Sequence, residues 1–162
     1  MELALTHPYP AGLDHVLKKF LDEGTILAKN ARIGARNVRV VQKRQDEASA
    51  KLVVEREMTA TVPVPGMLAS FHREWNAVRQ EEHWFQKDDG EWHCEFRVRI
   101  EGIPAKITGM MRLAGDSTAC ENQVTLNVRC DVPLLGKKIA RFLMDDSRDK
   151  IEREYEATRA LL

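Results

Sequence analysis

PLLGKKIARFLMDDSRDKIEREYEATRALL, residues 133–162, is the segment that decides the fold of this chain. Apolar residues recur in it at spacings of three and four, and charged residues fill the positions between them. This spacing is typical of an amphipathic helix that packs one face against a partner surface. A helix of this length extends for roughly 40 Å, which is enough to cross a small sheet. The apolar stripe comprises Leu135, Ile139, Phe142, Leu143, Ile151, Tyr155 and Leu162.

The preceding residues 37–132 are predicted to form about six strands, joined mostly by hairpins. The clearest strand covers residues 92–101, where apolar and polar residues alternate. Alternation of this kind indicates an antiparallel strand with one buried face and one solvated face. Asp89-Gly90, just before it, is a strong hairpin signal, because glycine readily adopts the positive φ of a tight turn. In residues 77–86 either phase buries a large aromatic side chain, so the inward face of that strand stays open.

The N-terminal part of the chain adds one strand and two short helices. Residues 1–6 alternate as a strand, and we expect the prolines of residues 7–10 to end it, because proline cannot donate a hydrogen bond to a ladder. Residues 14–20 follow helical spacing, and Gly24 is predicted to end that helix. A second short helix is predicted over residues 25–29, capped by Thr25 or by Asp22.

This order of elements favours an α+β fold over a parallel sheet, which would alternate strands and helices. We predict a single domain, residues 1–162, in which a curved antiparallel sheet of about seven strands wraps around the long C-terminal helix. A meander of this length must curve. The glycines at which it could bend are Gly102, Gly109 and Gly115.

Several short motifs support this picture by the order in which they occur. They are Tyr9-Pro10 before the first helix, Glu82 and Trp84 ahead of the Asp89-Gly90 turn, Glu101-Gly102-Ile103-Pro104 with Gly109 downstream, and VPLLGKKI over residues 132–139. Together with the element order, they resemble the helix-grip fold of the START-like (SRPBCC) superfamily, and within it the domain of unknown function 2505 group. That superfamily includes the birch pollen allergen, lipid-transfer domains and polyketide cyclases. The resemblance implies a fold and a cavity, and it implies no particular activity.

A curved sheet that grips a long helix encloses volume, and such a volume suits an apolar ligand. We therefore predict that a small hydrophobic molecule, lipid-like or aromatic, binds between the sheet and the C-terminal helix. Plain core packing is the alternative interpretation of the same side chains. Two polar groups could orient a ligand: Asn122, whose partner could also be a neighbouring strand, and the Tyr155 hydroxyl. The predicted cavity lining is Trp84, Trp92, Phe96, Val98, Met111, Asn122, Val124, Leu126, Phe142, Leu143 and Tyr155.

Motifs for nucleophilic catalysis, phosphate binding and zinc proteases are absent from the sequence. The five histidines lack metal-ligand spacing. We therefore predict no catalytic residue, no metal and no cofactor. Cys94, Cys120 and Cys130 form no CxxC pair, and we interpret them as small core residues rather than reactive thiols.

The 25 basic and 25 acidic residues give a net charge of zero, which argues against nucleic acid as a partner. Lys137, Lys138 and Arg141 could form a local basic patch, although a solvated helix face explains them more simply. The N-terminus does not resemble a signal peptide, and no apolar run is long enough for a membrane-spanning helix. We therefore expect a cytoplasmic protein, and the sequence leaves its oligomeric state open.

Three functions compete at this stage. The first is a carrier or binder of a small hydrophobic molecule, and the second is an enzyme of cyclase or hydrolase type that uses the same cavity. The third is a protein-interaction module with a filled core. A histidine, arginine or glutamate pointing into the cavity would favour the enzyme, a wholly apolar cavity the carrier, and a filled core with an exposed apolar patch the interaction module.

Overall fold

The computed structural model describes residues 1–71 and 73–162. Its elements follow the predicted order: β1 (Glu2–Tyr9), α1 (Leu13–Leu21), α2 (Glu23–Arg32), β2 (Arg36–Gln45), β3 (Ser49–Met58), a 3-10 turn η1 (Gly66–Leu68), β4 (Asn76–Gln86), β5 (Trp92–Ile100), β6 (Lys106–Gly115), β7 (Cys120–Arg129) and α3 (Gly136–Ala160).

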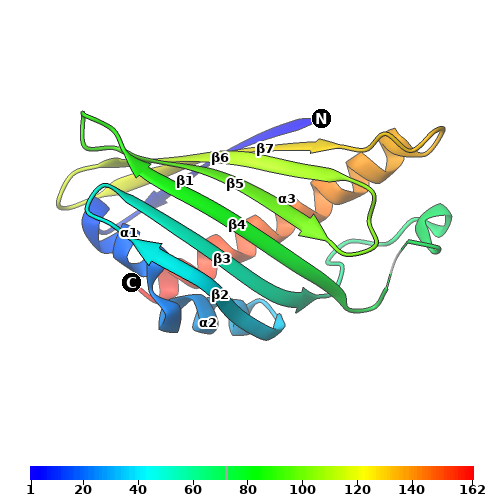
Figure 1. Ribbon diagram of the computed structural model, residues 1–162, viewed down its shortest axis with the longest axis horizontal. Helices are drawn as coiled ribbons and strands as arrows, with labels where there is room; N and C mark the ends of the chain where they lie inside the picture. Colours follow the sequence, from blue (N-terminus) through cyan, green and yellow to red (C-terminus); the bar gives the residue numbers. More distant parts are fainter. Residues whose placement is uncertain (72) are drawn as a thin grey trace.

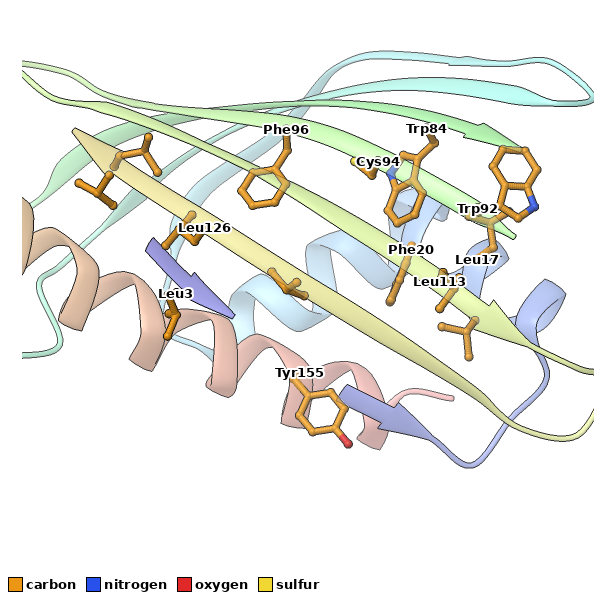
Figure 2. Packing of buried hydrophobic residues seen from close by; sticks show 14 of the residues in the cluster. Leu3, Leu17, Phe20, Trp84, Trp92, Cys94, Phe96, Leu113, Leu126 and Tyr155 are labelled. Atoms are coloured by element: carbon orange, nitrogen blue, oxygen red, sulfur yellow. The ribbon is translucent and has the colours of Figure 1, made fainter. Parts of the chain in front are cut away.

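One antiparallel sheet of seven strands curves around α3, and α1 and α2 pack beside it (Figure 1). The strand order is β1-β7-β6-β5-β4-β3-β2, so β1 and β2 are the two edges. The main core lies between the inner face of the sheet, α1 and α3 (Figure 2). The predicted α+β helix-grip fold is confirmed. In the described part of the chain, no helix is both long and apolar enough to cross a membrane.

Strand β1 is longer than predicted, and the expected break at His7 is wrong. The strand continues through Pro8, which pairs with Glu121 of β7, to Tyr9. Because β1 is an edge strand, the missing N–H of proline is tolerated there. The three additional residues matter for the interior, because they bring the buried side chains of His7 and Tyr9 to the inner face of the sheet.

The two short helices meet at Asp22, and the prediction that Gly24 ends the first helix is wrong. The Asp22 carboxylate caps α2, accepting hydrogen bonds from the N–H of Thr25 at 2.8 Å and from its hydroxyl at 2.9 Å. Gly24 therefore lies inside the first turn of α2. The five residues that α1 buries are Leu13, Val16, Leu17, Phe20 and Leu21, as the helical spacing indicates.

Helix α3 begins at Gly136, later than predicted, because the preceding Leu134 adopts a left-handed φ of 67°. From the predicted apolar stripe it buries Ile139, Leu143 and Tyr155. The remaining members of the stripe are partly buried against the same core: Leu135, Phe142, Ile151 and Leu162. This face of α3 packs on β1, β7 and α2.

The run of residues 51–62, rich in valine and threonine, predicts a strand that reaches Val62, but β3 ends at Met58, and the connection to β4 contains the 3-10 turn. The sequence also predicts one helical turn over residues 67–72, and His72 of that turn lies outside the described residues. On β4, Trp84 is fully buried and pairs with Cys94, while Glu82 pairs with Phe96. The phase that the sequence left open therefore directs the even-numbered residues of β4 inward.

We expect Gly109→Ala to lower the free energy of unfolding by about 1–3 kcal/mol, as overpacking in a core does. Gly109 pairs with Phe96 across β5 and β6, and a Cβ at this position would overlap the Phe96 ring and the carbonyl oxygen of Thr125. Urea unfolding followed by circular dichroism measures the effect. Gly66→Ala is the control, since a Cβ there meets no neighbour. Equal stability of the two variants would contradict the prediction.

Candidate ligand cavity

A cavity of about 130 Å³ lies between the inner face of the sheet and the C-terminal half of α3. The core is therefore not completely filled. Strands β5, β6 and β7 contribute mainly apolar side chains to the wall, whereas α2, β3, β4 and α3 also contribute charged and amide groups. For comparison, an engineered apolar cavity of about 150 Å³ holds one benzene molecule.

Most of the residues predicted to line a cavity do border this one: Trp84, Phe96, Val98, Met111, Asn122, Val124, Leu126 and Tyr155. Trp92, Phe142 and Leu143 do not. Trp92 is buried at the start of β5, near Leu17 of α1 (Figure 2). Phe142 and Leu143 belong to the first half of α3, which contacts the core beyond the cavity. That any of these residues binds a ligand stays a prediction.

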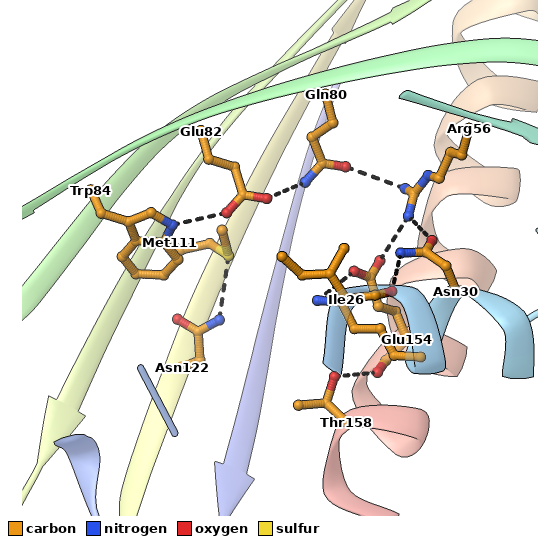
Figure 3. Close-up of polar contacts among 11 residues, drawn as sticks. Ile26, Asn30, Arg56, Gln80, Glu82, Trp84, Met111, Asn122, Glu154 and Thr158 are labelled. Atoms are coloured by element: carbon orange, nitrogen blue, oxygen red, sulfur yellow. Dashed lines mark hydrogen bonds and ion pairs between the residues drawn. The ribbon is translucent and has the colours of Figure 1, made fainter. Parts of the chain in front are cut away.

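A hydrogen-bonded row of polar side chains crosses the cavity wall, and the sequence interpretation missed it (Figure 3). The guanidinium of Arg56 donates to the Asn30 side chain and, through Nη2, to Gln80 Oε1 at 3.3 Å. Gln80 in turn donates to Glu82 Oε2 at 2.8 Å. The indole N–H of Trp84 donates to Glu82 Oε1 at 2.8 Å. Both oxygens of the Glu82 carboxyl thus accept hydrogen bonds from neighbours on β4.

Glu154 of α3 joins this row to two cations. Its carboxylate lies 3.0 Å from Lys29 Nζ and 3.9 Å from Arg56 Nη1. The side chains are 22%, 12% and 9% exposed, respectively, so water screens the pairs only in part. Burial acts to raise the pKa of Glu154, but the two cations and the hydrogen bond from Lys29 outweigh it and lower that pKa to about 2. Glu154 is therefore ionised at neutral pH.

The pKa of Glu82 is shifted in the opposite direction. The side chain faces the cavity and is only partly exposed, and burial raises the pKa of its carboxyl above the ordinary value. Lys29 and the hydrogen bonds from Trp84 and Gln80 oppose the shift without cancelling it. Two carboxyl groups at one cavity thus have pKa values displaced in opposite directions, which is an arrangement often found at functional sites.

Two buried polar atoms in this wall have no hydrogen-bond partner within residues 1–71 and 73–162: Arg56 Nε and Asn122 Oδ1. Asn122 was predicted to point inward, and it does; its amide donates to Met111 Sδ on the neighbouring strand at 3.4 Å. The Tyr155 hydroxyl is not free, contrary to prediction, because it donates to the Pro8 carbonyl oxygen. The Tyr155 ring stacks on His7, with 4.2 Å between ring centroids.

The connection between β3 and β4 is hydrogen-bonded to α3 beside the cavity. Asp146 of α3 accepts hydrogen bonds from the N–H of Thr61 at 2.7 Å and from its hydroxyl at 2.9 Å. The other oxygen of the Asp146 carboxylate lies 2.5 Å from Lys150 Nζ. Asp146 is only 5% exposed and, like Lys150, borders the cavity. This contact holds Thr61, three residues after the end of β3, at that end of the cavity.

The sequence matches one family model, described as "Protein of unknown function (DUF2505)", over residues 4–162. The chain belongs to this DUF2505 family. No curated protein sequence matches it.

Solved structures show that the fold of this DUF2505 protein is START-like. The Zhui aromatase/cyclase from Streptomyces sp. R1128 superposes with a TM-score of 0.63 at 13% identity, over 99% of this chain and 92% of that one. The STAR-related lipid transfer protein from Xanthomonas axonopodis gives 0.61 at 12% identity, over 98% and 85%. Human STARD10 gives 0.59 at 9% identity, over 97% and 62%. At these identities the likeness concerns the fold alone.

Period-two alternation could have found part of the polar row of the DUF2505 protein. Once Trp84 is taken as inward, Gln80 and Glu82 must share its face. Arg56 follows the same rule on β3, two residues before the buried Met58.

We expect the stability of the DUF2505 protein relative to its Glu82→Gln variant to fall as the pH rises above about 4.5. The folded pKa of Glu82 is raised from its ordinary value of 4.5, so ionisation costs more in the folded than in the unfolded chain. Glutamine resembles the protonated acid and does not ionise. Urea unfolding of both proteins at intervals of about one pH unit between pH 4 and pH 8 measures this stability difference. A stability difference that does not change with pH would contradict the raised pKa.

Proposed function

We propose that this protein binds a small ligand with an apolar body in the cavity between the sheet and α3, and that it acts as a carrier or binder of that ligand. One observation carries the proposal: the cavity has an apolar wall beside a charged and amide-lined wall. Phe96, Ile107 and Leu126 are among the apolar side chains that would contact the body of the ligand. Sites that combine apolar walls with a few convergent polar groups are typical of small-molecule binding.

The volume favours an aromatic or short-chain ligand over a complete lipid, because about 130 Å³ accommodates roughly one aromatic ring. Two proteins that share the fold, a lipid transfer protein and an aromatase/cyclase, are named for apolar molecules, which agrees with this proposal.

A wholly apolar cavity would be expected of a simple carrier, and this cavity is not wholly apolar. Arg56 and Glu82 at its wall favour the second candidate, an enzyme that uses the same cavity. A carboxyl whose pKa is raised at a cavity wall keeps its proton to a higher pH than an ordinary glutamate and can donate it as a general acid. If substrate turnover is found, Glu82→Gln should abolish it while leaving substrate binding in place.

A cavity-filling variant tests the binding proposal. Val98 lines the cavity, so Val98→Phe should place a ring inside it and remove ligand binding. Thermal shift across a panel of small aromatic and aliphatic compounds is the measurement. Val41→Phe makes the same chemical change on the exposed surface of β2, where Val41 is 45% exposed.

We expect at least one compound to raise the melting temperature of the wild-type protein and of Val41→Phe, and to leave that of Val98→Phe unchanged. If no compound stabilises the wild-type protein, or if Val98→Phe is stabilised equally, the cavity is not the binding site.

A further inference from the structure

We infer that the ligand of this cavity is a small aromatic carboxylate, whose anionic oxygens bind at the wall formed by Arg56 and Glu82; this inference rests on the proposed function. It adds the chemical class of the ligand and the residues that would recognise it. Four features of the cavity point to this class: a donor without a partner, a carboxyl without an acceptor, two cations that share one anion, and the size of the space.

The first observation is the incomplete hydrogen bonding of Arg56. Its two terminal nitrogens donate to Asn30 and Gln80, whereas Nε has no partner among the described residues. The side chain is only 9% exposed, so bulk water does not replace the missing partner. A buried donor that lacks an acceptor is costly, and a ligand oxygen admitted by a shift of the side chains around Nε would remove that cost.

The second observation concerns the proton of Glu82. Each Glu82 oxygen already accepts a hydrogen bond, one from Trp84 and one from Gln80. Burial favours the protonated carboxyl, and neither of these neighbouring N–H groups can accept the proton. A ligand oxygen at the cavity wall would provide the acceptor. The Arg56 Nε–H and the protonated Glu82 carboxyl are both hydrogen-bond donors, so each would bind a ligand oxygen rather than another donor.

The third observation is the charge of the wall. Lys29 and Arg56 carry two positive charges, and Glu154 supplies one negative charge. The other ionisable groups at the cavity are paired separately: Lys150 with Asp146, and His7 with Glu152. Burial disfavours a negative charge on Glu82, so an anionic ligand rather than Glu82 would balance the second cation. A single carboxylate does so, whereas a phosphate dianion would exceed it, and the planar guanidinium matches the carboxylate geometry.

The fourth observation is the space beside this wall. A cavity of about 130 Å³ admits roughly one ring. Aromatic side chains surround it, among them Phe20, Phe96 and Tyr155, and aromatic rings prefer edge-on or offset contacts with other rings. One aromatic ring with one carboxylate satisfies the apolar wall and the positive wall together.

Calorimetric titration at neutral pH tests the inference with benzoate and phenylacetate, each compared with its uncharged primary amide. We expect the carboxylates to bind the wild-type protein at least about tenfold more tightly than the amides, as a hydrogen bond to a charged group implies. Arg56→Lys retains the charge but lacks Nε–H, and it should lose most of this preference. Arg39→Met replaces an exposed arginine of β2 and should keep the preference for carboxylates.

The outcomes separate the two proposals. Equal binding of acids and amides would overturn the carboxylate inference and leave the binding function intact. A carboxylate preference that Arg56→Lys leaves unchanged would overturn the role of Arg56. Toluene is titrated as well, as a ring without a polar group. If the acids, the amides and toluene all fail to bind, the inference and the proposed function both fail. Because the acid and amide comparison uses the wild-type protein, it does not depend on the folding of any variant.

Discussion

Replacing Glu154 with glutamine is expected to lower the free energy of unfolding at pH 7 by about 3 kcal/mol, within the range for breaking a buried ion pair. The substitution leaves Lys29 and Arg56 without their shared anion, although both side chains are almost completely buried. Glutamine preserves the shape of the side chain, so the loss reports on charge rather than on packing.

The effect should depend on pH in a defined window. The folded pKa of Glu154 is about 2, below its ordinary value of 4.5, so the unfolded chain binds the proton first as the pH falls. The stabilisation is complete above pH 4.5 and is lost between about 4.5 and 2. Wild-type protein and Glu154→Gln should therefore differ at neutral pH and converge near pH 2.

Glu156→Gln is the matched control for this experiment. Glu156 lies on the exposed face of the same helix, with a side chain that is 67% exposed and 3.9 Å from Arg159. Its loss should change stability by less than about 0.5 kcal/mol. If Glu154→Gln is no more harmful than Glu156→Gln at pH 7, the charged wall of the cavity does not exist as described.

Trp84→Ala is expected to lower the free energy of unfolding by about 3–5 kcal/mol, as large-to-small core substitutions do. Trp84 is completely buried, packs 5.8 Å from Phe20 between ring centroids, and donates a hydrogen bond to Glu82. The substitution opens a void next to the existing cavity and leaves Glu82 Oε1 without its donor. Urea unfolding followed by far-ultraviolet circular dichroism measures the loss.

Comparison with Trp75→Ala shows whether the stability loss in Trp84→Ala comes from the burial of Trp84 or from the removal of any tryptophan. Trp75 is only partly buried, and the Arg36 guanidinium lies 3.9 Å from the centroid of its ring. A cation–π contact at such a position contributes about 0.5–1 kcal/mol. Similar losses for the two tryptophans would show that Trp84 is not the central core residue that its burial indicates.

Local patterns predicted the parts of the fold that depend on local chemistry. The spacing of Ile139, Leu143 and Tyr155 indicated the buried face of α3, and Asp89-Gly90 indicated the β4–β5 hairpin, where Gly90 has a φ of 88°. The length of β1 could not be predicted in this way. Pro8 is acceptable only because β1 is an edge strand, and edge position follows from tertiary pairing with β7.

The site was predictable in its apolar half and not in its charged half. Phe96, Val124 and Leu126 follow strand alternation, so they could be assigned to the interior without the structure. Lys29, Arg56 and Glu154 come from three elements distant in the sequence, and nothing in their local spacing indicates that they meet.

Native mass spectrometry of the wild-type protein, followed by denaturing extraction, tests the central claim most directly. We predict a reproducible extra mass of a small aromatic acid or similar apolar molecule, which Val98→Phe loses and Val41→Phe retains. Wild-type protein that carries no added mass, even after incubation with benzoate and phenylacetate, would contradict the claim that this cavity is a ligand site.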